Sequence, residues 1–179
     1  MILYKNVDIC DLESIMKNGI LSMDECKNNN WDVGKRAEND TSVVYMFDPI
    51  SRQNSFPSYG VALLEVETEA EENKMRKNDI HKDDYREYIT KRVSPQKIKR
   101  VIIPELFKKY IEIPENIHIT WCGLKAKHYG EIGLENADNT ILEQFAKTAP
   151  LMDCTLYNFF RGVTEKDTII DLYDVEYVF

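Results

Sequence analysis

The pattern of apolar and polar residues at the start of the chain predicts a strand, a helix and a glycine turn. Residues 2–5 suit a short strand that begins almost at the first residue. Asp8 is a good helix cap, with Asp11 at the third helical position as in a variant of the capping box. The apolar residues recur at helical spacing: Ile9, Leu12, Ile15 and Met16. Gly19 stands where a helix ends in left-handed backbone, so we expect the helix to end there.

Further apolar or alternating runs predict strands along the rest of the chain. They are residues 42–47, 60–66, 87–90, 100–103, 116–121 and 175–179. The run at 60–66 is almost continuously apolar, which indicates burial on both faces. Ser94 caps a turn that has Pro95 at its first helical position. Helices are expected at residues 105–111, 139–147 and 151–161, and a glycine-punctuated loop at 123–133.

A long polar segment, residues 22–41, interrupts this pattern. Loops of this length inside a compact domain are often binding loops or lids. Trp31 is a large aromatic residue in otherwise hydrophilic surroundings. It either pins the loop to the body of the protein or, with Lys35 and Arg36, faces a planar ligand that bears phosphate. Both interpretations remain open.

Composition and charge narrow the possible partners. The 179 residues are 43% hydrophobic and 30% charged, which fits one ordinary globular domain or one domain with an elaborated end. The formal net charge of −8 argues against a broad surface that follows nucleic-acid phosphates. A local basic cluster around the Ser94 turn is the exception, and it suits a solvated turn or contact with a nucleic acid or an acidic partner at low salt. Its residues are Lys91, Arg92, Lys97, Lys99 and Arg100. A basic or neutral protein partner is favoured over a nucleic acid.

The cysteines and the N-terminus indicate a cytoplasmic protein without metal. The four cysteines lie far apart in sequence and form no Cys-x-x-Cys pair, so a zinc framework has little support. His118 and His128 do not match a recognised ligand spacing either. No secretory signal is evident, and no segment approaches the roughly 20 apolar residues that span a bilayer. We therefore expect reduced thiols, a cytoplasmic location and no membrane partner.

Glu87 is the first candidate for a functional residue. It lies at the entrance of an expected strand, just after a long charged segment and beside Tyr85 and Tyr88. A carboxylate in that position is suited to meet a ligand in a cleft, although it is also one acid among 31.

The order of these pieces resembles the ADP-ribosyltransferase superfamily, in particular its small bacterial and phage-associated branches. The resemblance covers about residues 2–104. Its motifs are Leu3-Tyr4-Lys5-Asn6, residues 12–20, Val43-Val44-Tyr45-Met46-Phe47, Tyr59-Gly60-Val61-Ala62-Leu63-Leu64-Glu65-Val66, and Arg86-Glu87-Tyr88-Ile89-Thr90 with the Ser94–Ile98 turn. Each motif is weak, and their order and spacing together make the resemblance.

The resemblance implies an α+β fold, namely a split β-sandwich of two small antiparallel sheets with peripheral helices. Residues 1–104 would form the NAD-binding core. Residues 105–179 would be a mainly helical extension that completes or decorates the same domain. The implied activity is cleavage of the nicotinamide–ribose bond of NAD and transfer of ADP-ribose to a macromolecule, with a protein acceptor favoured.

The resemblance also implies the site residues. Glu87 would be the catalytic carboxylate, because departure of nicotinamide builds positive charge on the ribose. Tyr45 would stack on the nicotinamide ring, and Lys5 would take the first-strand position, which is usually His or Arg. The remaining residues expected to contact NAD are Tyr4, Asn6, Tyr59, Trp31 and Arg36.

Two positions depart from the family pattern and keep other functions open. Lys5 lacks the planar fork of arginine and the ring of histidine. Tyr85 stands where many members place Gln or Glu to choose the acceptor, so arginine as the acceptor is not supported. Transfer to a nucleobase, to another side chain or to water stays open. The main alternative is a catalytically inactive protein of the same fold that binds or inhibits a partner. RNA 2′-phosphotransferase chemistry and a Cys122–His128–Asp138 nucleophile set are weaker alternatives.

Overall fold

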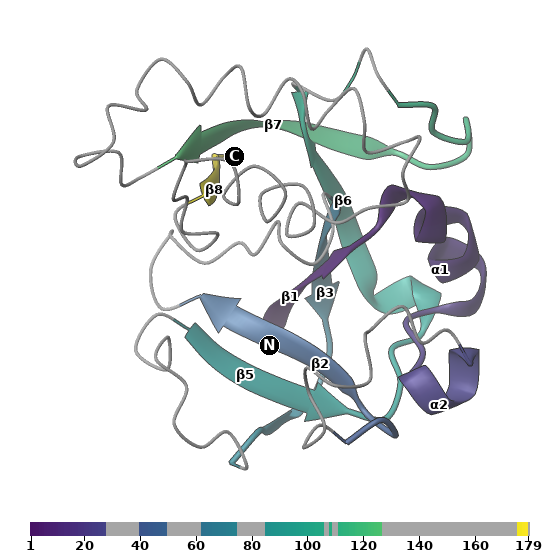
Figure 1. The fold of residues 1–179 in the computed structure, drawn as a ribbon, viewed down its shortest axis with the longest axis vertical. Helices are drawn as coiled ribbons and strands as arrows, with labels where there is room; N and C mark the ends of the chain where they lie inside the picture. Colours follow the sequence, from purple (N-terminus) through teal and green to yellow (C-terminus); the bar gives the residue numbers. More distant parts are fainter. Residues whose placement is uncertain are drawn as a thin grey trace, which may run out of the picture.

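The frame of the molecule is a β-sheet. The computed structural model describes residues 1–27, 40–49, 62–74, 85–105, 108, 111–126 and 175–178 (Figure 1). Within these residues, eight strands form one sheet: β1 (Ile2–Val7), β2 (Val44–Pro49), β3 (Ala62–Glu67), β4 (Glu71–Glu72), β5 (Tyr85–Thr90), β6 (Ile98–Pro104), β7 (Ile119–Ala126) and β8 (Val175–Val178). Their order across the sheet is β4-β5-β2-β1-β3-β6-β7-β8. β6 and β7 are parallel, and the other neighbours are antiparallel.

The helices of the described residues are few and short. They are the 3-10 helix η1 (Ile9–Asp11), α1 (Leu12–Asn18), α2 (Met23–Cys26) and the 3-10 helix η3 (Pro95–Lys97). One large sheet with few helices agrees with the expected α+β class. The helices expected at 139–147 and 151–161 lie outside the described residues.

The sheet buries apolar side chains on both faces, because residues alternate along each strand. The first face packs under α1 through buried residues that include Leu3, Leu12, Leu64, Val66, Val101 and Ile103. The second face has a smaller cluster of Phe47, Leu63, Ile102, Cys122 and Tyr177, with Tyr4 packed against it. The continuous apolar run in β3 is explained by this arrangement, since neighbouring residues enter different clusters.

β1 and β2 share much less of their length than the other central strands. Six Cα partners join β1 to β3, and six join β2 to β5. Between β1 and β2, the described residues have one registered pair, Tyr4 with Phe47. Figure 1 shows β2 and β5 as a pair that crosses the direction of β3 and β6. The sheet therefore changes direction at the β1–β2 junction, beside Tyr4.

Gly19 ends α1 as expected, but with a different backbone conformation. Its φ of 86° and ψ of −177° combine a positive φ with an extended ψ, a region that only glycine adopts readily. The next residue, Ile20, exchanges two backbone hydrogen bonds with Val93, at 2.9 and 3.0 Å. A Cβ on Gly19 would lie 2.1 Å from the Val93 carbonyl oxygen. The close approach of the 93–95 turn is thus the reason for glycine here.

Asp8 is the N-cap residue of η1, as expected, and Asp11 is the third residue of that helix. The Asp8 side chain makes no cap bond, however, and α1 itself begins only at Leu12. The capping box occurs instead at α2, where the Ser22 hydroxyl accepts from the Glu25 N–H and the Glu25 carboxylate accepts from the Ser22 N–H. This helix lies in the segment expected to be loop, because four residues with little apolar character give no helical periodicity.

The bounds of the strand β7 differ from those expected. Residues 123–126, expected to be loop, belong to β7, because they pair with β8. The terminal strand itself is confirmed at Val175–Val178. Both strands belong to the expected 105–179 extension, and both lie in the same sheet as β1.

Candidate functional site

A row of cross-strand neighbours brings polar side chains together on one face of the sheet. Tyr4 of β1 is the Cα partner of both Phe47 and Glu65. Phe47 is in turn the partner of Glu87, and Glu65 is the partner of Arg100. Directly opposed residues project from the same face of a sheet. The row therefore runs across five strands, in the order Glu87, Phe47, Tyr4, Glu65 and Arg100.

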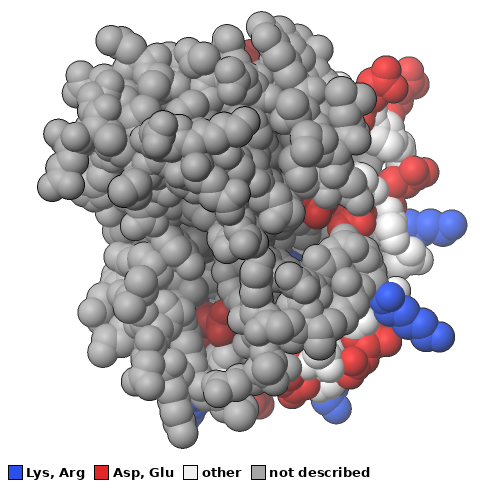
Figure 2. All heavy atoms as spheres, viewed as in Figure 1, with Lys and Arg blue, Asp and Glu red and all other residues white. Residues whose placement is uncertain are grey.

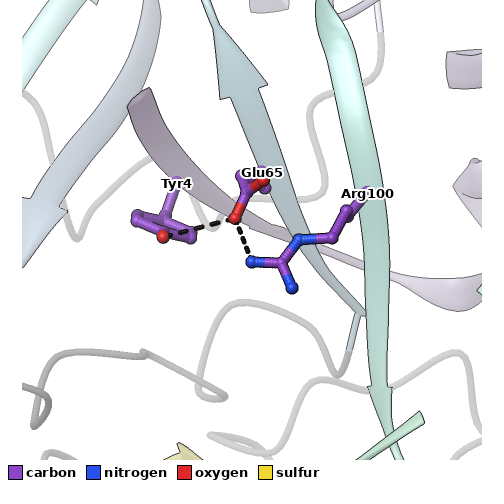
Figure 3. A network of polar contacts seen from close by, with 3 residues as sticks. All are labelled: Tyr4, Glu65 and Arg100. Atoms are coloured by element: carbon purple, nitrogen blue, oxygen red, sulfur yellow. Dashed lines mark hydrogen bonds and ion pairs between the residues drawn. The ribbon is translucent and has the colours of Figure 1, made fainter. Parts of the chain in front are cut away.

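Glu65 is the centre of a polar network in this row. Figure 3 shows its carboxylate between Tyr4 and Arg100, with the three side chains coming from β1, β3 and β6. The Tyr4 hydroxyl donates to Glu65 Oε2 at 3.4 Å, and Arg100 forms an ion pair with the same oxygen. The Glu65 side chain is only 13% exposed, against 37% for Arg100. A nearby cation offsets the cost of removing the carboxylate from water.

The network keeps its donors protonated. Burial raises the pKa of Tyr4, and the neighbouring Glu65 carboxylate raises that pKa further. The hydrogen bond that Arg100 donates to Glu65 raises the pKa of Arg100 as well. At neutral pH, Tyr4 is therefore a neutral donor and Arg100 a cation, and both hold Glu65 in one orientation.

Glu87 lies at the other end of the row and is held by a different partner. The Asn73 side-chain amide donates to Glu87 Oε1 at 2.7 Å. The Asn73 backbone N–H also donates to the Glu87 carbonyl, at 2.8 Å. Asn73 follows the two-residue strand β4, which pairs with β5. These two bonds fix both the strand position and the carboxylate of Glu87.

Of the residues expected to contact NAD, Tyr4 and Tyr45 lie on the same face as Glu87. Tyr45 precedes Phe47 by two residues in β2, so both project from the same side. The Tyr45 ring is half-buried, and its hydroxyl donates to the Asp40 carbonyl at 3.0 Å. The Tyr4 and Phe47 rings have centroids 6.1 Å apart. The row therefore has an aromatic middle and a carboxylate toward each end.

Lys5 lies on the opposite face. Its Cα partner is Leu64, which belongs to the core under α1. Its ammonium donates to the Tyr45 carbonyl at 3.1 Å, across the junction where β1 and β2 diverge. The structure thus brings Glu87, Tyr45 and Tyr4 to one face and separates Lys5 from them.

Asn6 and the loop residues have other positions. Asn6 is buried, and its amide donates to the Tyr177 hydroxyl at 3.2 Å, which links β1 to β8. Trp31, Arg36 and Tyr59 lie outside the described residues. The backbone of Tyr85 begins β5, opposite Pro49.

Sequence reasoning missed three of the polar residues on this face, Glu65, Arg100 and Asn73. Two of them had a usable signal. Glu65 is the single acid in the apolar run that became β3, and Arg100 directly precedes three apolar residues of β6. A charge inside a strand with buried neighbours requires a partner. Asn73 had no such signal, since it lies in a charged segment.

The structure bears on one residue of the Cys122–His128–Asp138 nucleophile set. Burial raises the pKa of Cys122 from 9.0 to about 12, so its thiol stays protonated at neutral pH and is a poor nucleophile. His128 and Asp138 lie outside the described residues, and His118 is exposed. No group of three His, Cys, Asp or Glu side chains in the described ranges is arranged to hold a metal ion.

The charged surface is mixed. Figure 2 shows acidic and basic side chains next to each other along the edge where α1 and α2 lie. A mixed surface does not attract one sign of charge strongly. No helix in the described part of the chain has both the length and the apolar character needed to cross a membrane.

No protein-family model matches the chain, and neither a curated protein nor a solved structure matches it.

Proposed function

We propose that the protein is an NAD-dependent ADP-ribosyltransferase with Glu87 as its catalytic carboxylate. The observation that supports this proposal is the adjacency of β5, β2 and β1, with Glu87, Tyr45 and Tyr4 on one face. The motifs of the resemblance that contain Glu87, Tyr45 and Tyr4 fall on these three strands, which are distant in the chain.

The chemistry requires one fixed carboxylate near the ribose. The bond between ribose C1′ and the nicotinamide nitrogen breaks, and its electron pair leaves with nicotinamide, which becomes neutral. Positive charge then develops on C1′ and the ring oxygen, and the Glu87 carboxylate stabilises it. A nucleophilic protein side chain forms the new bond to C1′ and gives up its proton to Glu87 or to water. Asn73 holds Glu87 in position for this step.

The strand spacing between Glu65 and Glu87 agrees with one catalytic carboxylate, Glu87. Glu87 and Glu65 are separated by three strand intervals of roughly 4.8 Å, or about 14 Å. Two carboxylates that act on one glycosidic bond lie roughly 5 to 9.5 Å apart. On this backbone spacing along the sheet, Glu65 and Glu87 belong to different parts of the site, and the spacing suits the two ends of an extended dinucleotide.

The proposal includes a sheet divided into two small parts. The one registered pair between β1 and β2 supports a division at this junction, with β4, β5 and β2 on one side and β1, β3 and β6 on the other.

The test is cleavage of NAD labelled in the nicotinamide ring, together with transfer of label from adenine-labelled NAD to proteins. We expect wild type to release nicotinamide and Glu87→Gln to lose at least a hundredfold in rate, since it removes the charge that the transition state needs. Glu13→Gln is the matched control, because Glu13 is exposed on α1 at the opposite face. Equal rates in wild type and Glu87→Gln would exclude Glu87 as the catalytic residue.

The position of Lys5 favours the second candidate, an inactive protein of this fold that binds a partner. Its ammonium is engaged by the Tyr45 carbonyl on the far face, so it does not supply the first-strand contact that the resemblance implies. Stoichiometric NAD binding separates the two candidates, because the inactive binder is expected to show neither NAD binding nor nicotinamide release.

A further inference from the structure

We infer that Glu65, held by Tyr4 and Arg100, binds the ribose hydroxyls of the adenosine half of the nucleotide. The inference rests on the proposed function for the identity of the nucleotide as NAD. It concerns a residue that the sequence resemblance does not assign, and it gives the site a second carboxylate with a binding role.

The orientation of the Glu65 carboxylate differs for its two oxygens. Tyr4 and Arg100 both contact Oε2, and among the described residues no contact falls on Oε1. An ionised carboxylate offers about four acceptor positions. The two protein donors thus fix one oxygen and leave the other able to accept hydrogen bonds.

A largely buried glutamate in the middle of β3 costs stability. Glu65 lies in the middle of β3, and its side chain on the second face of the sheet is only 13% exposed. A glutamate at such a position loses hydration, and an apolar residue would be the simpler choice for stability. The network of three polar side chains therefore suggests a ligand role, with Arg100 supplying the compensating charge.

The hydroxyls of a ribose suit a carboxylate such as Glu65. A vicinal diol presents two O–H donors, and a carboxylate is a well-suited acceptor for them. Dinucleotide-binding folds of another class use an acidic residue on a ribose hydroxyl for the same reason. Arg100, whose side chain is 37% exposed, balances the charge of Glu65, so the pair does not repel a nucleotide that bears phosphate.

The position of Glu65 along the row of cross-strand neighbours fits the second ribose of NAD. Glu65 lies on the same face as Glu87, about 14 Å away by strand spacing. If Glu87 acts on the nicotinamide ribose, Glu65 is placed for the other ribose. Lys5 cannot take this role, since it lies on the opposite face.

The test compares binding of ADP and 2′,3′-dideoxy-ADP by calorimetry at one fixed salt concentration. We expect wild type to bind ADP about tenfold more tightly than the dideoxy compound, which corresponds to the loss of hydrogen bonds to a charged acceptor. Glu65→Gln should bind the two compounds with nearly equal affinity. Glu67→Gln is the matched control, because Glu67 is exposed on the same strand and pairs with Lys99, so it should retain the wild-type preference.

A second variant protects the test against a folding defect in Glu65→Gln. Tyr4→Phe keeps the ring beside Phe47 and removes only the hydroxyl that holds Oε2, so it should reduce the preference for ADP about threefold. Thermal unfolding of each variant is measured first. An unchanged preference in a folded Glu65→Gln, or in Tyr4→Phe if Glu65→Gln does not fold, overturns the inference. So does wild type that fails to bind ADP or does not distinguish the two compounds.

The outcome for Glu65 is separable from that for the proposed activity. Glu87→Gln should lose nicotinamide release and keep the tenfold preference for ADP. If wild type releases no nicotinamide but still distinguishes ADP from the dideoxy compound, the transferase proposal fails and the ribose site stands. If nicotinamide is released and the hydroxyls make no difference to binding, the transferase proposal stands and the role of Glu65 is wrong.

Discussion

At the residue scale, two glutamates on one face of the sheet have different surroundings. Glu65 is held by a tyrosine and an arginine, whereas Glu87 is held by a neutral amide. A carboxylate already paired with a cation is a weaker stabiliser of a second positive charge than one paired with an amide. This difference is why we assign catalysis to Glu87 and binding to Glu65.

Asn73 is the residue through which we expect Glu87 to be positioned. Asn73→Ala removes the 2.7 Å bond to the carboxylate and keeps the backbone bond to β5. Loss of one such bond is worth about 1 kcal/mol, so kcat for nicotinamide release should fall about fivefold.

The Asn73 prediction is checked by steady-state kinetics with NAD. The KM should change little, because the lost bond holds Glu87 and not the nucleotide. Asn18→Ala, which removes an exposed amide at the end of α1, should leave both constants unchanged. A raised KM with unchanged kcat would contradict a positioning role.

At the element scale, contacts distant in sequence determine where several elements end. Gly19 was identified from the helical pattern before it, and the end of α1 agrees. Its conformation, however, is determined by Val93, whose carbonyl bonds the Ile20 N–H. The Ser94 turn follows at once, and α1 ends where that turn meets it.

Gly19→Ala is expected to destabilise the protein by about 2 to 4 kcal/mol. The positive φ alone costs an alanine roughly 1 to 3 kcal/mol. The added Cβ would also lie 2.1 Å from a backbone oxygen, so the 93–95 turn must move. Urea unfolding measures the change. An effect below about 0.5 kcal/mol, which is usual for surface substitutions, would contradict the close contact.

At the scale of the whole molecule, β8 returns to the centre of the fold through one buried contact. The Tyr177 hydroxyl accepts a hydrogen bond from Asn6 of β1, 171 residues away in sequence. Tyr177 and Cys122 belong to the same apolar cluster on the second face. Burial raises the pKa of Tyr177 well above 10.0 and that of Cys122 to about 12.

The raised pKa values of Cys122 and Tyr177 predict that the protein loses stability at alkaline pH. Both pKa values are higher in the folded state than in the unfolded chain, so only the unfolded chain loses these protons as the pH first rises. The stabilisation is complete below pH 9.0 and decreases through the window from 9.0 to about 12 for Cys122, and above 10.0 for Tyr177. The slope approaches about 1.4 kcal/mol per pH unit for each group.

Urea unfolding at pH 7, 9, 10 and 10.5 tests this pH dependence. Cys122→Ala should be less stable at pH 7, owing to the lost side-chain volume, and should show a shallower decline between pH 9 and 10.5. Because Tyr177 still titrates in this variant, the decline should not vanish. Parallel pH profiles of wild type and Cys122→Ala would show that the thiol is not buried as described.

The sequence alone determined the local elements. Alternation and helical spacing are properties of neighbouring residues, so most strands and the first helix were found within a few residues of their bounds. Glu87 and Tyr45 could be named as candidate site residues from the sequence, since the motifs that contain them are local. Short features without periodicity, such as α2 and the end of β7, were not found, because a capping box or a partner strand decides them.

Only the tertiary structure decided which residues share a face. Strand register depends on pairing between distant segments, and a shift by one residue moves a side chain to the other face. That is why Lys5 lies away from Glu87 and Tyr4 lies with it, although the two are adjacent in the chain. The same register brings Glu65 and Arg100 together from two apolar strands and places them in line with Glu87.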